Sequence, residues 1–109
     1  MDKAVFNSEG IPTASISQND SGNGWLSTFS SKGAILVNLG ANGDSSGTLT
    51  VNASDGKAAI ILGARAEMGG LLVVRNKTGE GIVNLSADEY GNGVVGAWNR
   101  KERKLKPGP

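Results

Sequence analysis

The sequence predicts an all-β protein built from tandem 23-residue repeats. Two series of glycines recur every 23 residues, apolar residues alternate with other residues inside each repeat, and no segment keeps a helical period. The first glycine series is Gly10, Gly33, Gly56 and Gly79, and the second is Gly24, Gly47, Gly70 and Gly93. Two series in the same register over four repeats indicate an ordered array.

The repeat divides the 109-residue chain into one β-repeat domain, residues 1–109. Its units are 2–24, 25–47, 48–70, 71–93 and the partial unit 94–109. Each unit is expected to contribute two strands, because its apolar columns fall into two groups.

The columns at the second, fourth, thirteenth and fifteenth positions of the unit are mostly apolar. The fifteenth holds Ile16, Leu39, Leu62 and Leu85. Alternation with a period of two is the signal of a strand with one apolar face. We therefore predict a first strand through positions 2–4, a second through positions 13–15, and burial of Leu62 and Leu85.

Short polar turns that end in glycine join the two strands of a unit, as in residues 52–56. Glycine adopts positive φ without steric cost, as a hairpin with a bulge requires. The connection between units, for example 40–47, predicts a longer exposed loop. Residues 58–68 resemble a helix most closely, but Gly63 interrupts them and the repeat assigns a strand followed by a loop.

The apolar face of this ribbon needs cover, and the predicted elements include no helix to provide it. A solenoid, a closed barrel or prism, and pairing of faces between copies all remain open. Small aliphatic side chains favour a β-solenoid or β-prism completed by oligomerisation, with a homotrimer preferred. The large aromatic residues have the opposite parity from the apolar columns, which suggests that the second face is partly covered. They are Phe6, Trp25, Phe29 and Trp98.

The composition excludes several chemistries. The chain has no His and no Cys, so imidazole and thiolate catalysis, soft-ligand metal sites and disulfides are absent. We expect no enzymatic activity, no cofactor and no metal. Acidic residues recur in the predicted loops, but Arg65 stands in unit 3 where unit 4 has Asp88, which argues against a repeated calcium site.

The charge distribution is uneven, although the net charge is only +1. Residues 1–93 carry 6 basic and 9 acidic groups, whereas residues 94–109 carry 5 basic and 1 acidic. We interpret the basic end as a solubilising cap or a partner for acidic loops of another copy, and expect no nucleic-acid partner. No apolar stretch is long enough for membrane insertion or a signal peptide. The location stays open, since an extracellular or cell-surface protein would need a targeting segment outside this sequence.

A binding module is the alternative to a structural role. Aromatic rings beside polar side chains can stack on sugars. The candidate ligand-binding residues are Trp25, Tyr90, Trp98 and Asp88. The first expectation is a non-enzymatic structural or adhesive homo-oligomer, and the alternative is a module that binds carbohydrate or another ligand.

The runs 69–81 and 88–101 resemble glycine-punctuated β-repeats of uncharacterised bacterial and environmental proteins. The resemblance covers units 2 to 5 well and unit 1 loosely. It implies a β-solenoid-like or β-prism-like repeat that oligomerises. Similar units often end a longer chain behind a membrane-anchored or coiled-coil stalk. The resemblance implies no activity and no catalytic residue.

Overall fold

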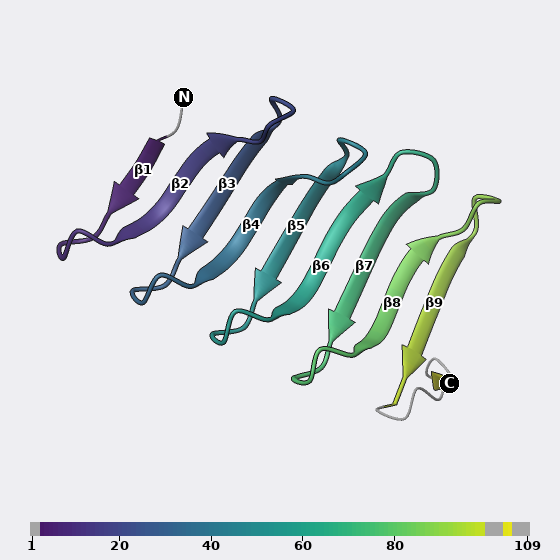
Figure 1. Cartoon of the computed structure of the whole chain (residues 1–109). Helices are drawn as coiled ribbons and strands as arrows, with labels where there is room; N and C mark the ends of the chain where they lie inside the picture. The colour runs from purple at the N-terminus through teal and green to yellow at the C-terminus, as the bar shows by residue number, and fades with distance from the viewer. Residues whose placement is uncertain (1–2, 100–103, 106–109) are drawn as a thin grey trace.

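The computed structural model describes residues 3–99 and 104–105, and in them the chain is all-β. All strands belong to one antiparallel sheet (Figure 1). The strands are β1 (Lys3–Phe6), β2 (Pro12–Gln18), β3 (Gly24–Phe29), β4 (Ile35–Ala41), β5 (Gly47–Asn52), β6 (Ala58–Arg65), β7 (Gly69–Arg75), β8 (Gly81–Ala87), β9 (Gly93–Trp98) and β10 (Lys104–Leu105). The predicted all-β class and the two strands per unit are confirmed, and residues 58–68 form a strand followed by a turn.

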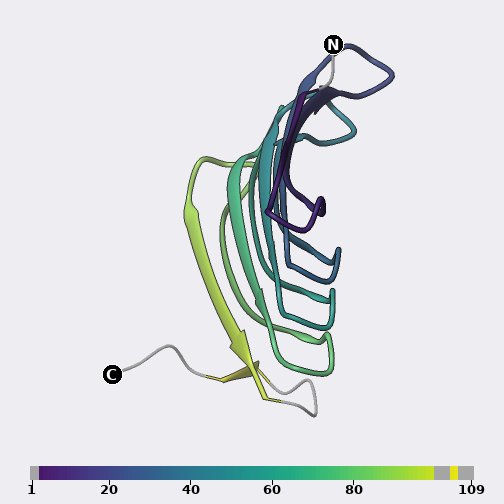
Figure 2. The same cartoon turned by 90° about the vertical axis from the view of Figure 1, so that its left-hand side faces the viewer.

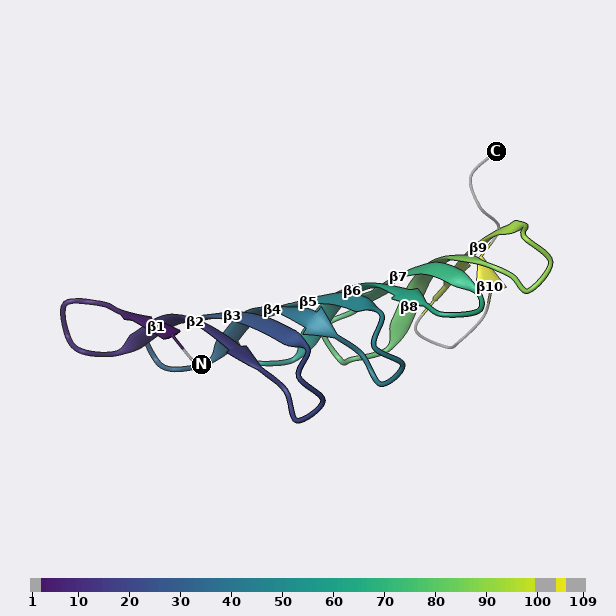
Figure 3. The ribbon, with the colours of Figure 1, turned by 90° about the horizontal axis from the view of Figure 1, so that it is seen from above.

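The sheet is a single open layer in which every strand pairs with its sequence neighbours, in the order β1 to β10. The molecule measures 50 × 29 × 20 Å. Seen from the side, both ends of the strands bend toward the same face (Figure 2), and the view from above shows a modest twist (Figure 3). A bulge follows the fourth position of each full unit, and such bulges bend strands.

The strand register places the predicted apolar columns on one face, because these residues pair with one another across all nine long strands. We call this the aliphatic face. It consists of Lys3, Val5, Ala14, Ile16, Leu26, Thr28, Val37, Leu39, Leu49, Val51, Ile60, Leu62, Leu72, Val74, Val83, Leu85, Val95 and Ala97. The opposite side of the sheet, which carries Trp25, is the mixed face.

The described residues form no apolar core. Leu62 is 46% exposed and Leu85 is 40% exposed, so the prediction that both are buried is wrong for the single chain. The alternation correctly predicts which residues share a face of the sheet. It does not predict whether a second layer covers that face. Burial of these leucines therefore requires something beyond this sheet.

The hairpin turns at both ends of the sheet are short. Gly10, Gly33, Gly56 and Gly79 close one set with positive φ, as predicted. The other set is closed by Gly22, Ser45 and Gly91, and Gly69, the first residue of β7, also has positive φ. The long loops predicted between units are therefore wrong: β4 and β8 continue further, and turns as short as those at the opposite end follow them.

A polar side chain opens most of these turns and accepts hydrogen bonds from two backbone N–H groups inside it. Asn76 Oδ1, for example, accepts from the N–H groups of Thr78 and Glu80 at 3.1 and 3.0 Å. The equivalent residues are Asn7, Asn19, Ser30, Asn42 and Asp88. Such side-chain bonds favour a tight turn over an open loop.

Ala53 opens the turn between β5 and β6 and has no side-chain oxygen for this purpose. We expect Ala53→Asn to raise the free energy of unfolding by about 0.5–1 kcal/mol, because a new hydrogen bond contributes on that scale. Denaturant unfolding at one protein concentration measures the change. Ala53→Leu is the control, and an equal gain from it would contradict this explanation.

Candidate functional site

The aliphatic face carries most of the exposed large hydrophobic side chains of the described residues. Ile16, Leu39 and Leu62 are 56%, 47% and 46% exposed. From β2 to β9 this face carries no charged side chain, and its polar residues are Thr28 and, at the end of β2, Gln18. Soluble monomers rarely expose so large an apolar patch, so this face is the first candidate for an interaction surface.

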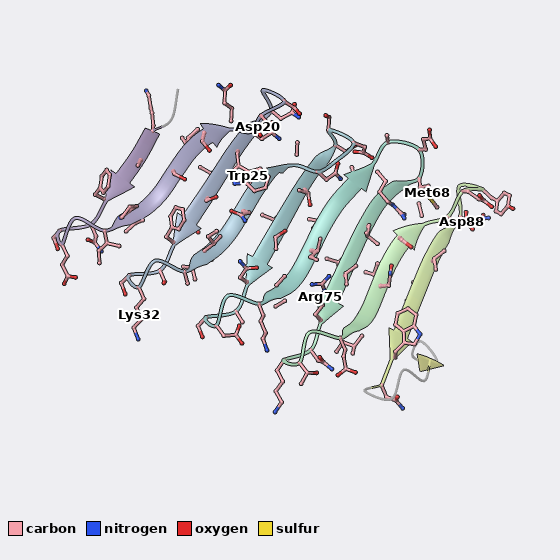
Figure 4. The ribbon with its side chains drawn as sticks, in the orientation of Figure 1. Asp20, Trp25, Lys32, Met68, Arg75 and Asp88 are labelled. Atoms are coloured by element: carbon pink, nitrogen blue, oxygen red, sulfur yellow. The ribbon has the colours of Figure 1, made fainter. Side chains whose placement is uncertain are left out.

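The mixed face is different, because indole rings on this face cover the neighbouring glycines. Trp25 lies across Gly40, where an alanine Cβ would stand only 2.1 Å from the indole ring (Figure 4). Trp98 covers Gly96 in the same manner, with the corresponding distance 2.4 Å. Near Trp25, the hydroxyl of the buried Ser27 donates to Asn38 Oδ1. The expectation that the aromatic residues lie opposite the apolar columns is confirmed.

A depression of about 420 Å³ lies on the mixed face beside Trp98. Val73, Glu80 and Asn84 line it together with the indole ring. The Oδ1 atom of Asn84 is buried and has no hydrogen-bond partner among the described residues. An aromatic surface next to an unused amide oxygen suits a polar ligand with one apolar side.

Hydrogen bonds link successive hairpins at one end of the strands, where Figure 4 labels Asp20, Met68 and Asp88. Each joins residues 22 apart in the sequence. Asn42 Nδ2 donates to the Ala64 carbonyl at 2.9 Å, and Asp44 Oδ2 accepts from the Ala66 N–H at 3.0 Å. Arg65, at the position that argued against a calcium site, donates to the Ala87 carbonyl at 3.1 Å. These side chains therefore brace neighbouring turns.

Two carboxyl groups at this edge have altered acidity. The Ala66 N–H, followed by the hydroxyl and N–H of Ser46, lowers the pKa of Asp44 below its ordinary value of 3.8. The backbone N–H of Asn92 does the same to the pKa of Asp88. Both groups are solvated, and donated hydrogen bonds stabilise their charged forms.

The direction of these pKa shifts predicts acid sensitivity. A carboxylate whose pKa is lower in the folded state stabilises the fold above its unfolded pKa, and that contribution disappears as the pH falls through the folded pKa. We expect unfolding free energy to decline below about pH 4, starting near the ordinary pKa of 3.8. Asp44→Asn combined with Asp88→Asn should flatten this decline. An unchanged pH profile in the double variant would contradict the assignment.

The structure places the four candidate ligand residues at three separate locations. Asp88 and Tyr90 share one turn, where Asp88 Oδ1 accepts from the Tyr90 N–H and the tyrosine ring is 78% exposed. Trp98 lies at the opposite end of β9, and Trp25 lies on β3, six strands away. The sequence did not identify Asn84 and Glu80 as candidates. The alternation on β8 could have indicated Asn84, because it places this residue on the face of the sheet opposite to that of Val83 and Leu85.

Other features bear less directly on a site. The described residues contain no cluster of three or more acidic side chains arranged to hold a metal ion. They also contain no helix long and apolar enough to cross a membrane. Of the basic residues near the end, Arg100, Lys101, Arg103 and Lys106 lie outside the described residues, and only the backbone of Lys104 is described.

A comparison with protein-family models gave no match, and a comparison with curated protein sequences gave none either. The surfaces of the sheet therefore provide the evidence for a function.

Proposed function

We propose that this chain is a non-enzymatic structural or adhesive module that acts as a homo-oligomer. The observation that carries the proposal is the exposed aliphatic face, on an open sheet that encloses no apolar core in its described residues. A single layer with both faces in water buries too little apolar surface to offset the entropy of ordering the chain. Identical copies provide the missing layer with surfaces of the same pattern and length.

A trimeric β-prism is the preferred arrangement, because three narrow sheets around one axis would enclose small aliphatic side chains. The resemblance to glycine-punctuated repeats of bacterial proteins agrees with such a role. The absence of His and Cys removes the commonest nucleophile and base pairings, which favours structure over catalysis.

Light scattering of the purified chain across a dilution series tests the proposal. A trimer would give a mass about three times the formula mass of 11.1 kDa, independent of concentration above its dissociation range. Any stable closed oligomer supports the general proposal, and a dimer or tetramer would replace the trimer. A folded monomer at 11.1 kDa would overturn it.

The depression beside Trp98 supports a second candidate function, the binding of a carbohydrate or similar ligand. Titration with oligosaccharides, followed by tryptophan fluorescence, tests it. Trp25→Phe leaves Trp98 as the one emitting indole, and the reciprocal variant Trp98→Phe is the matched control. A saturable signal in the first variant and not in the second would support a site at Trp98. The absence of a signal with every sugar would reject this candidate.

A further inference from the structure

We infer that the aliphatic face is the contact surface between copies of this chain and that the mixed face points outward. The inference rests on the proposed homo-oligomer and names the surface that forms it. The occupant to which it commits is the aliphatic face of a second and a third copy. Four observations support the assignment: area, charge, curvature and the position of one glycine series.

The area of the aliphatic face matches what a stable interface needs. Strands in a sheet are about 4.8 Å apart and alternate side chains on one face about 6.8 Å apart, so eight strands and three rows of residues cover about 800 Å². A standard interface buries about 800 Å² on each partner. The charged side chains of β2–β9 and of their turns lie at the strand ends or on the mixed face. Over these strands the aliphatic face is therefore free of charge, as the core of a protein interface usually is.

The bend of the strands leaves the aliphatic face open. The hairpin ends lean toward the mixed face, which is the side that faces the reader in Figures 1 and 4 (Figure 2). No described turn therefore overhangs the aliphatic rows. The mixed face, by contrast, has its own indole covers over Gly40 and Gly96.

Contacts among the described residues do not explain the second glycine series. Gly24, Gly47 and Gly93 lie at the starts of strands without positive φ, and an added Cβ would meet no atom within 4 Å. At Gly70 the nearest atom would be 3.9 Å away. Glycine weakens a strand, so a repeated strand glycine often marks a place where another backbone approaches closely.

These glycines form a third row on the aliphatic face beside the leucines. They precede Leu26, Leu49, Leu72 and Val95 by two residues each; three of them pair with alanine, and Gly24 pairs with Gln18. The alanine partners are Ala41, Ala64 and Ala87. A row of small residues beside a row of large ones lets the leucines of one copy fit against the glycines of the next. We therefore assign this row as the line of closest approach between copies.

Cysteine labelling tests the assignment, because the chain has no native Cys to interfere. Leu62→Cys probes the aliphatic face and Ile61→Cys, its neighbour, probes the mixed face. In the single chain Leu62 is the more exposed of the two, at 46%, so its thiol would react faster with Ellman's reagent. In the assembly we expect the reverse order, with the thiol at 62 about tenfold slower or more.

The outcomes separate this inference from the proposed function. A monomeric wild-type protein would reject both the proposed homo-oligomer and the assignment of its contact face. An oligomeric wild type in which the thiol at position 62 still reacts faster than the thiol at 61 overturns the inference and leaves the homo-oligomer standing. Leu49→Cys and Thr50→Cys form a second pair on opposite faces of β5, to be used if a variant of the first pair fails to fold.

A valine in the glycine row tests the line of closest approach directly. Gly47→Val suits the strand, and its Cβ would have no described atom within 4 Å, so folding of the chain should be retained. We expect it to raise the dissociation constant of the assembly about tenfold or more, since a new side chain would separate the copies. Thr48→Val, on the mixed face, should leave that constant unchanged. Equal effects of the two variants would reject the line of closest approach.

Discussion

Replacing Gly40 by alanine should lower the free energy of unfolding by about 1–3 kcal/mol, the usual cost of forcing a side chain into an occupied space. The added Cβ would lie 2.1 Å from the Trp25 ring, so the indole must leave its position over the sheet. In a Trp98→Phe background, the emission of the remaining Trp25 should shift to longer wavelength as the ring enters water.

A double-mutant cycle isolates this contact. With Trp25→Ala already in place, Gly40→Ala should cost little or even stabilise, because alanine is the better strand residue once the ring is gone. A cost that is the same with and without Trp25 would show that the tryptophan does not depend on Gly40.

Replacing Gly56 by alanine should lower the free energy of unfolding by about 1–2 kcal/mol, since residues other than glycine are strained at positive φ. Gly56 has a φ of 86° and no atom within 4 Å of a Cβ position, so backbone conformation alone accounts for the expected loss. Chemical denaturation at one protein concentration measures it.

Ser45 provides the matched test with the opposite sign. It is the one residue other than glycine with positive φ in the described part of the chain, at 68°. Ser45→Gly should therefore gain part of what Gly56→Ala loses, although it also removes the 3.2 Å hydrogen bond from Asn23 Nδ2. Ser45→Ala removes the same bond without relieving the backbone. The prediction is wrong if glycine and alanine at position 45 give equal stability.

The sequence was sufficient to predict the repeat, because two glycine series recur every 23 residues. It was also sufficient to predict the two strands per unit and the composition of the faces, because these follow from local alternation. The second set of turns was missed for a physical reason. The spacing alone predicts that Gly47 and its equivalents lie in loops, whereas side chains such as Asn42 shorten the turn and leave those glycines in strands. Spacing along the chain does not distinguish a turn glycine from a strand glycine.

The burial of the leucines and the cover over Gly40 depend on more than one strand. The pairing of Leu26 with Leu39 brings Trp25 next to Gly40, and this requires the register between β3 and β4. Burial of Leu62 depends on a second layer that no pattern within one chain supplies. The candidate ligand residues lie at three separate locations in the sheet. They occupy no fixed position in the repeat, so the repeat does not bring them together.

Because each strand pairs only with its neighbours in the sequence, the length of the sheet is proportional to the number of repeat units. Every full unit adds two strands, which lengthens the layer by about 10 Å at the usual strand spacing. Duplication or loss of a 23-residue unit would leave the pairing inside the remaining units intact, because no strand depends on a distant one. The length of such a molecule can therefore change in steps of one unit while its cross-section stays constant.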